Sequence, residues 1–309
     1  MGGRPAADSE VIAAPAWQEI TRMGLRGLVM IVGGADTGKS TLARWLLRRL
    51  TVAGATPVAF LDGDPGQSSL GPPATVTLAI LSAEDGDSPG SGRRWRRFIG
   101  STSPREHMLP LLAGIARLVE VARIRRFRTV LYDTTGLIDP TQGGTALKLA
   151  KIELLRPEIL IAIQRRSELE PLLGPLRRSA RTRLIELVCP PDLPSRSTGA
   201  RQRYRAKQFA AHFAGSRILE LDLSHFAVMP QDKPEGNRLV AFEDAAGFTR
   251  ALGIAVEPAG ASGKVAILTP LRNLAPIDAI RQADLWVDPV SFRDRPISPV
   301  NKGGTVASR

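Results

Sequence analysis

A glycine-rich segment, G-G-A-D-T-G-K-S-T at residues 33–41, restricts the fold more than any other feature of this chain. It follows the apolar run L-V-M-I-V (28–32) and precedes a stretch with apolar residues at helical spacing, Leu42, Leu46 and Leu50. This order of strand, loop and helix is the context in which Gly-x4-Gly-Lys-Ser forms a Walker A loop. The segment therefore predicts an α/β fold with a phosphate site after its first strand.

The residue types in this loop suit a nucleoside triphosphate. The glycines let consecutive backbone N–H groups converge on phosphate oxygens, and the start of the helix adds a positive partial charge. In such loops the lysine, here Lys39, reaches the β- and γ-phosphates, and the serine, here Ser40, ligates Mg²⁺. The predicted nucleotide-binding residues are Gly33, Gly34, Ala35, Asp36, Thr37, Gly38, Lys39, Ser40 and Thr41.

Short apolar runs alternate with amphipathic stretches along most of the chain. Continuous apolar strands between helices indicate a mostly parallel sheet with helices on both faces. The runs expected as strands are 28–32, 57–61, 129–133, 159–163, 184–188 and 218–221. The expected fold class is therefore α/β, a P-loop NTPase with a small C-terminal β-rich domain.

Changes in composition suggest three parts. Residues 1–24 are rich in Ala, Gly and Pro and are expected to form a flexible arm, followed by the P-loop domain over 25–225. Short strands with turns are expected over 226–309, with a frayed tail at the end. The Gly/Ser/Pro-rich segment 84–92 is the predicted tip of a β-hairpin.

The clearest predicted helix lies between the second and third of the expected strands. Its 3.6-residue stripe comprises Met108, Leu111, Leu112, Ile115, Leu118, Val119 and Ala122. The sequence Ser103-Pro104-Arg105-Glu106 predicts a capping box at its start. Pro110 would then lie inside the helix and is expected to kink it.

The charge of the chain favours polyanionic partners. Forty-two Lys plus Arg against thirty Asp plus Glu give a net charge of +12, which attracts nucleic acid or acidic lipid headgroups. An alternative for each arginine cluster is a solvated helix face or loop. The clusters are 93–97, 123–128, 177–183 and 196–205.

The remaining composition indicates a cytoplasmic protein. Cys189 is the only cysteine, so an intrachain disulfide and a cysteine-based zinc site are both excluded. We expect no signal peptide and no membrane association, because the start lacks an apolar segment and no later run is long enough to span a bilayer.

Two acidic motifs follow predicted strands. Asp133 ends T-V-L-Y-D, where a Walker B carboxylate orients the metal, although a helix N-cap is an alternative. The second motif is Asp62-Gly63-Asp64-Pro65-Gly66-Gln67 (62–67), at the edge where open α/β sheets bind ligands. Its carboxylates and amide are suited to position a hydroxyl nucleophile and accept its proton. A plain Asp-Pro-Gly turn is the alternative.

Together the motifs resemble one family. G-G-A-D-T-G-K-S-T, L-D-G-D-P-G-Q, D-T-T-G-L and R-S-T-G-A-R-Q-R-Y-R occur in the order found in the P-loop polynucleotide 5′-hydroxyl kinases, the RNA 5′-kinases of mRNA 3′-end formation, tRNA splicing and rRNA processing. The resemblance covers roughly residues 28–225, and D-x-D-x-G-Q is its most specific element. It implies ATP- and Mg²⁺-dependent phosphorylation of the 5′ end of single-stranded RNA, with DNA as the alternative polymer.

The resemblance also implies residue roles. Asp64 is the implied general base for the 5′-hydroxyl, and an R-x-x-x-R pair on the mobile lid is matched by Arg201 and Arg205, which stabilise charge on the phosphoryl group. An exposed helix face is the alternative for these arginines. The implied catalytic residues are Asp64, Lys39, Arg201 and Arg205, the metal ligands are Ser40, Asp62 and Asp133, and the substrate contacts are Gln67, Thr135, Gly136 and Arg196.

Two departures from the family are visible. Its RNA clasp reads T-x-G-W, whereas Leu137 occupies the tryptophan position here, so an aromatic that stacks on a base is missing. Trp95 is a candidate replacement, but a tryptophan on the surface or packed in the sheet is the preferred interpretation. Eukaryotic members also carry an N-terminal β-domain, whereas about two dozen residues precede the P-loop strand here.

Other functions stay open from the sequence. They are a non-catalytic ATP-binding scaffold for RNA processing, a P-loop GTPase and a small-molecule kinase. The absence of an N-K-x-D tetrad and of a metal-ligand cluster disfavours the GTPase. The three histidines, His107, His212 and His225, show no metal spacing and are interpreted as packing or surface residues.

Overall fold

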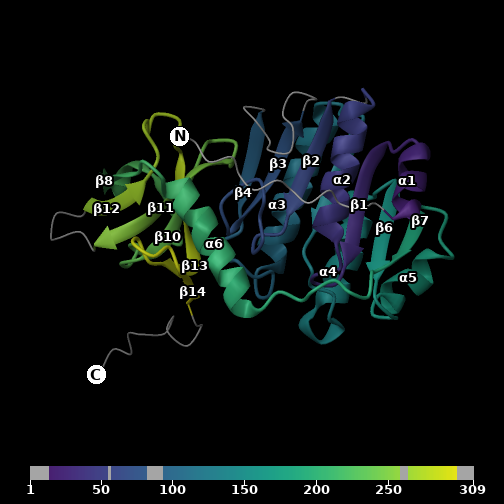
Figure 1. Cartoon of the computed structure of the whole chain (residues 1–309). Coiled ribbons are helices and arrows are strands. Elements are labelled where there is room, and N and C mark those ends of the chain that lie inside the picture. The colour runs from purple at the N-terminus through teal and green to yellow at the C-terminus, as the bar shows by residue number, and fades with distance from the viewer. Residues whose placement is uncertain (1–13, 55–56, 82–92, 258–263, 298–309) are drawn as a thin grey trace, which may run out of the picture.

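The computed structural model describes residues 14–54, 57–81, 93–257 and 264–297. The first part comprises α1 (Pro15–Arg22), β1 (Gly27–Gly33), α2 (Lys39–Val52), β2 (Val58–Gly63), β3 (Thr75–Leu81), β4 (Arg94–Phe98), α3 (Met108–Ile124), β5 (Thr129–Thr134), α4 (Gly144–Leu155), β6 (Ile159–Gln164), α5 (Glu170–Leu176), β7 (Arg183–Val188) and α6 (Thr198–Phe213). The second part comprises β8 (Arg217–Asp222), β9 (Ala227–Met229), β10 (Arg238–Glu243), β11 (Thr249–Glu257), β12 (Lys264–Thr269), β13 (Ala279–Val287) and β14 (Asp294–Pro296). Each part forms one sheet, and the two sheets lie next to each other (Figure 1).

The first sheet has the order β4-β3-β2-β5-β1-β6-β7. The strands β2, β5, β1, β6 and β7 are parallel, which confirms five of the six strands expected from the apolar runs. β3 and β4 add an antiparallel hairpin at one edge, as the sequence predicts, while the expected hairpin tip lies outside the described residues. The carboxyl ends of β1, β2 and β5 therefore meet at one edge of the sheet.

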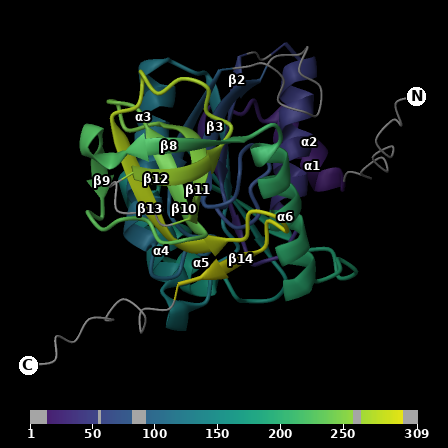
Figure 2. The ribbon, with the colours of Figure 1, turned by 90° about the vertical axis from the view of Figure 1, so that its left-hand side faces the viewer.

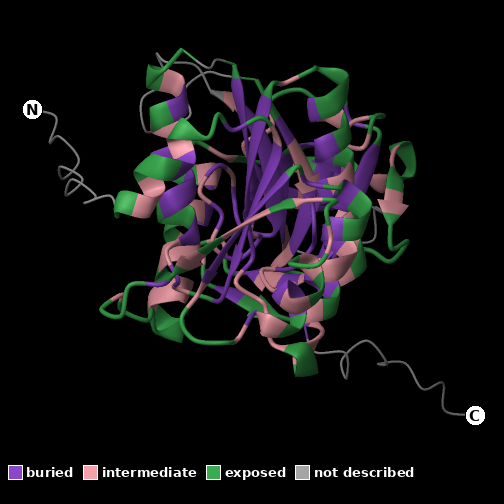
Figure 3. Ribbon diagram, turned by 90° about the vertical axis from the view of Figure 1, so that its right-hand side faces the viewer, coloured by how far each residue is buried: buried purple, intermediate pink, exposed green. Residues whose placement is uncertain are grey.

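Helices cover both faces of this sheet, so its central strands are buried (Figure 3). α3, α4 and α5 pack on one face, with Leu118 and Leu147 in that core. α2 packs on the other face through Leu42 and Leu46. The burial patterns of β1, β2 and β5 are almost unbroken, which is the physical reason for their continuous apolar sequences.

Two expectations about the ends of the first domain are wrong. Residues 218–221 do form a strand, β8, but it pairs antiparallel with β12 in the second sheet. Within the segment expected to be a flexible arm, residues 15–22 form the helix α1. Ile20 is buried there and the Trp17 ring lies 5.6 Å from the Trp45 ring, so packing on α2 orders this segment.

The helix α3 begins later than the sequence predicts. Its first residue is Met108, and its N-cap His107 has no side-chain capping bond, so the predicted capping box is wrong. Glu106 has a φ of 61°, which interrupts helical geometry before the helix can form. Pro110 is thus the third residue of the helix, where its missing N–H has no intrahelical partner to lose, and the basis for the expected kink disappears.

The second sheet has the order β14-β13-β10-β11-β12-β8, with β9 alongside β13. Short strands after residue 226 are therefore confirmed. α6 lies against this sheet (Figure 2) and buries Phe209 and Phe213 with Leu252 and Leu285. Among the described residues, every helix is too short or too polar to cross a bilayer.

Candidate active site

The P-loop joins β1 to α2, and the side chain of its lysine folds back over the loop. Gly38 adopts a φ of 89°, a conformation that glycine accommodates without strain. Lys39 is buried, and its Nζ donates to the carbonyl oxygen of Gly34. Burial lowers the pKa of Lys39, while the charges of Asp133 and Asp64 oppose that shift. The loop thus holds its cation at the sheet edge where these carboxylates lie.

Asp133, at the carboxyl end of β5, combines burial with an unsatisfied oxygen. Its side chain bonds to Ser40, but its Oδ1 atom has no hydrogen-bond partner among the described residues. Burial raises the pKa of Asp133 to about 6, although the Lys39 charge and the Ser40 bond act in the opposite direction. A carboxylate oxygen without a partner beside a serine hydroxyl fits a hard cation such as Mg²⁺.

The loop of residues 64–71, which we call the acceptor loop, follows β2 and contains the last four residues of the predicted motif 62–67. It is organised by Asp62. Asp62 lies in register with Asp133 on the neighbouring strand. Its Oδ2 atom accepts from the Ser68 hydroxyl at 3.1 Å and from the Leu70 amide at 3.0 Å. Burial raises the pKa of Asp62, and hydrogen bonds from backbone amides, among them those of Ser69 and Leu70, counteract the shift. Asp62 therefore shapes the loop, and metal ligation by Asp62 stays a prediction.

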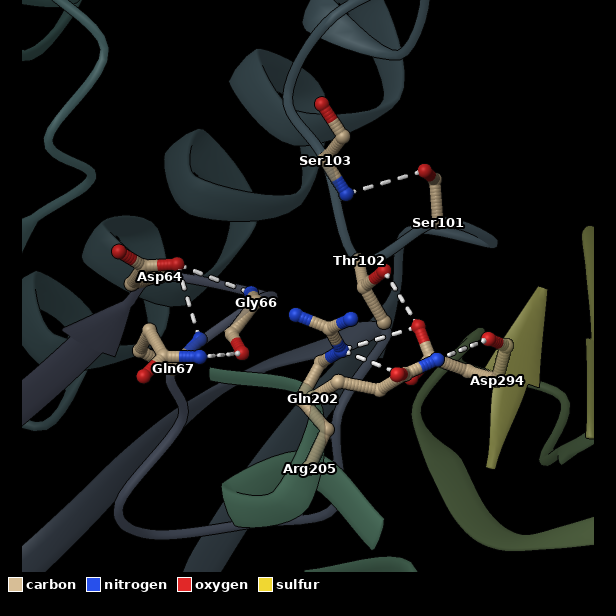
Figure 4. A network of polar contacts seen from close by, with 9 residues as sticks. All are labelled: Asp64, Gly66, Gln67, Ser101, Thr102, Ser103, Gln202, Arg205 and Asp294. Atoms are coloured by element: carbon tan, nitrogen blue, oxygen red, sulfur yellow. Dashed lines mark hydrogen bonds and ion pairs between the residues drawn. The ribbon is translucent and has the colours of Figure 1, made fainter. Parts of the chain in front are cut away.

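Asp64 projects from the same loop at the site edge. Its Oδ1 atom accepts from the backbone amides of Gly66, at 2.9 Å, and Gln67, at 3.1 Å (Figure 4). The Gln67 side chain donates to the Gly66 carbonyl at 2.6 Å, and its buried Oε1 atom has no hydrogen-bond partner among the described residues. Fixing one carboxylate oxygen by backbone bonds orients the other for a proton transfer.

The helix α6, which carries the two predicted lid arginines and is called the lid helix for that reason, contacts both loops. Arg201 donates to Asp36 of the P-loop at 2.7 Å, and the same carboxylate accepts from the Arg196 backbone amide at 3.0 Å. One turn further on, the Tyr204 hydroxyl donates to the Ser68 carbonyl at 2.9 Å, which ties the helix to the acceptor loop. Arg205 donates to Asp294 of β14. The two predicted lid arginines thus point into different polar networks.

The turn after Asp133 packs against the P-loop through Gly136. A Cβ atom at Gly136 would lie 2.8 Å from the Ala35 Cα atom, so only glycine fits this close approach. Lys148 of α4 is fully buried and donates to the Thr134 hydroxyl at 2.7 Å and to the Thr135 carbonyl at 2.6 Å. Leu137 packs against the core instead of presenting a surface for a base.

The sequence did not indicate a role at the site for two buried charged residues, Lys148 and Asp294. A lysine within an otherwise apolar helix, as in L-K-L-A-K-I (147–152), was the one local signal for Lys148. Asp294 gives no local signal, because it lies in a three-residue strand without a motif.

Trp95 and the three histidines either pack in the structure or lie at its surface. Trp95 is buried in the core of the first sheet, which confirms the packing interpretation over base stacking. His212 accepts from the Leu252 amide at 3.1 Å, and burial lowers its pKa to about 3. His107 contacts Asp284 at 3.2 Å, and His225 lies in the exposed turn Leu223–His225. Among the described residues, no group of acidic, His and Cys side chains has the arrangement of a metal site by itself.

The sheet order, the P-loop and the aligned carboxylates define a P-loop nucleotide-binding protein of the α/β class. The family model of the mRNA cleavage and polyadenylation factor CLP1 P-loop matches residues 33–215, and the chain belongs to this family.

Individual relatives give the same result. The chain is 30% identical over 215 residues to a polyribonucleotide 5′-hydroxyl-kinase of Methanocaldococcus jannaschii, covering 70% of this chain and 58% of that protein. It is 33% identical over 200 residues to the corresponding kinase of Thermococcus kodakarensis, covering 65% and 55%. The chain therefore spans a little over half the length of the curated relatives it matches.

A solved structure shares the fold. The wild-type Clp1p–Pcf11p complex contains a chain that matches this one with a TM-score of 0.68 at 14% identity, covering 87% of this chain and 77% of that chain. The coverage extends beyond the P-loop domain, so the arrangement with a second, C-terminal sheet is shared as well.

Proposed function

We propose that the protein is an ATP- and Mg²⁺-dependent kinase that transfers a γ-phosphoryl group to the 5′-hydroxyl of single-stranded RNA. The observation that carries the proposal is the position of Asp64, whose carboxylate lies at the same sheet edge as Lys39 and Asp133 and is electrostatically coupled to both. A P-loop with a carboxylate at its acceptor side has the parts that a hydroxyl-directed phosphotransferase requires. The naming of the archaeal relatives as polyribonucleotide 5′-hydroxyl-kinases supports the same acceptor.

The residues divide the reaction between them. The 5′-hydroxyl oxygen attacks the γ-phosphorus as the bond to the β–γ bridging oxygen breaks, and Asp64 accepts the hydroxyl proton. Lys39 and the lid arginines Arg201 and Arg205 neutralise charge on the transferred group. Ser40 and Asp133 would hold Mg²⁺, which would supply positive charge against the negative charge of the triphosphate. ADP and a 5′-phosphorylated polymer are the products.

The charge of the chain supports transfer to a polymer end over transfer to a small free acceptor. The chain carries a net charge of +12, which attracts a polyanion at long range. Binding of RNA should then weaken steeply with added salt, because phosphate contacts release counterions. We also propose a cytoplasmic location, where RNA is available as an acceptor and where a reducing environment keeps the buried thiol of Cys189 reduced.

The test is transfer of labelled γ-phosphate from ATP, with Mg²⁺, to a short single-stranded RNA with a 5′-hydroxyl, next to a DNA of the same sequence. Asp64→Asn should lower the turnover number by about 10²–10⁴-fold and leave ATP affinity unchanged, because general-base catalysis is lost and the nucleotide contacts are kept. The exposed carboxylate Asp232 offers a matched control, and Asp232→Asn should retain full activity. Retained ATP binding with no transfer to either polymer would reject the kinase and favour an ATP-binding scaffold.

A further inference from the structure

The second sheet contributes one buried carboxylate to the neighbourhood of the acceptor loop. Asp294, the first residue of β14, is 4% exposed. Both of its oxygens accept from the Nε atom of Arg205 at 2.9 Å, and one also accepts from the Thr102 hydroxyl at 3.2 Å. A buried charge of this kind is costly unless it is paired, and here the pairing partner is a predicted lid arginine.

The contacts of Asp294 fix the face of α6 on which Arg205 lies. Gln202 is one turn before Arg205 and donates to the backbone carbonyl of Asp294 at 3.2 Å. The strand β14 therefore holds two successive positions of the lid helix, one through its main chain and one through its carboxylate. This double attachment restricts both the rotation of the helix and the side-chain rotamer of Arg205.

The same network reaches the acceptor loop from the opposite side. Thr102, which donates to Asp294, has its carbonyl oxygen against Gly66, where a Cβ atom would come within 2.4 Å. Gly66 is also the residue whose amide binds Asp64. Figure 4 draws the Arg205 guanidinium between Asp294 and the turn of Asp64, Gly66 and Gln67, with one terminal nitrogen on the side of Gly66.

We propose that Asp294 is a positioning residue that aims Arg205 at the transferring phosphoryl group, so that the C-terminal sheet completes the catalytic centre. The bond to Asp294 uses the Nε–H, and the remaining guanidinium donors stay on the terminal nitrogens, where a phosphate is bound in a fork geometry. The Arg205 side chain is thus held in one conformation before the reaction, so no free energy is needed to order it in the transition state. This inference rests on the proposed function for the identity of the acceptor.

A purely structural alternative is that Asp294 only attaches the C-terminal sheet to α6. In that case its removal lowers stability and leaves the turnover number of the folded enzyme unchanged. A positioning role instead predicts that removal of the Asp294 carboxylate lowers the turnover number and changes the KM for ATP little. The two roles also differ in a double-mutant cycle, because a positioning residue has no effect once the group it positions is gone.

The experiment compares Asp294→Asn, Arg205→Ala and the double variant. Asp294→Asn keeps the shape of the side chain and should lower the turnover number by about 10- to 100-fold, the range for a partner that orients a functional group. The double variant should be no slower than Arg205→Ala. The exposed Asp288, which caps the turn before β14 by accepting from the Ser291 amide, provides the control Asp288→Asn, with unchanged turnover. Thermal unfolding of each variant identifies the fraction that is folded.

A second measurement separates this inference from the proposed function. The affinity for ADP with aluminium fluoride and Mg²⁺, a mimic of the transferring phosphoryl group, does not require an RNA acceptor. Asp294→Asn and Arg205→Ala should weaken this mimic by similar factors and leave the affinity for ADP alone unchanged. If the wild-type protein phosphorylates no RNA, the proposed function is rejected while this measurement still tests the role of Asp294. Unchanged affinity for the mimic and additive effects in the cycle would overturn the inference.

Discussion

The two sheets differ in what they bury. The first sheet ends in buried polar groups at its carboxyl edge, among them Lys39, Asp62, Asp133 and Thr135. The second sheet buries mainly apolar side chains such as Phe242 and Ile280, and Asp294 is its polar contribution near the acceptor loop. Buried charged groups lower the stability of the first sheet, because their desolvation is costly. Buried apolar side chains in the second sheet stabilise the fold and offset that cost.

This difference predicts that substitutions in the two regions have opposite consequences. The largest effect is expected for Lys39→Met, which removes the P-loop cation and keeps an apolar chain of similar length. Turnover should fall by about 10²–10³-fold or more, because a preorganised positive charge at the phosphates is lost. The free energy of unfolding should not decrease, since burial already disfavours the charged form of Lys39. Phosphate transfer and urea denaturation measure the two quantities.

The exposed Lys264 at the start of β12 serves as the control. Lys264→Met should change neither turnover nor stability. A Lys39→Met protein that is clearly less stable than wild type would contradict the view that the polar edge of the first sheet is kept for function alone.

The opposite pattern is expected for Phe242→Ala in the second sheet. The Phe242 ring is fully buried against the core of β10, β11 and β13. Removing it should lower the free energy of unfolding by about 3–5 kcal/mol, through lost transfer energy and a cavity. The turnover number per folded molecule should be unchanged at low temperature. Val290→Ala, at a position that is 86% exposed, is the control and should be within about 0.5 kcal/mol of wild type.

The same comparison explains which features the sequence could predict. The strands of the first sheet were predictable because β1, β2 and β5 are buried on both faces and therefore read as unbroken apolar runs. The P-loop and the loop of Asp64 were predictable because their contacts are local. Asp64, for example, bonds to amides only two and three residues away.

Features that depend on tertiary pairing were not predictable. The partner of Asp294 is 89 residues distant, and no spacing rule connects a lid helix to a short edge strand. The strand β8 has an apolar pattern like that of its neighbours in sequence, and only its pairing with β12 assigns it to the second sheet. The helix α1 is stabilised by contacts such as that between Trp17 and Trp45. The Pro- and Ala-rich composition of this segment gave no indication of these contacts.

The smallest predicted effect concerns Lys151 of α4, on the opposite face of β5 from Lys39. Lys151 is fully buried near the Tyr132 ring, and its Nζ atom has no hydrogen-bond partner among the described residues. Burial lowers its pKa to about 7, against the opposing charge of Asp64. The unfolded chain, with an ordinary lysine pKa of 10.5, therefore binds more protons than the folded one between about pH 7 and pH 10, and stability contributed by this group rises with pH.

Lys151→Met should remove this contribution. The variant is expected to be more stable than wild type at pH 7, and this difference should decrease by about 2 kcal/mol toward pH 9. Folding of the wild type requires Lys151 to lose a proton that the unfolded chain keeps, and the free energy of that loss decreases as the pH approaches 10.5. Urea denaturation of both proteins at the two pH values measures this difference. The difference includes the response of Lys148, whose pKa is lowered by burial and, next, by the charge of Lys151. A constant difference between the proteins across this range would mean that Lys151 stays charged in the folded state. The charge of Lys151 would then act on Asp64 together with the charge of Lys39. The group of buried charged residues at the edge of the first sheet would in that case include Lys151 of α4.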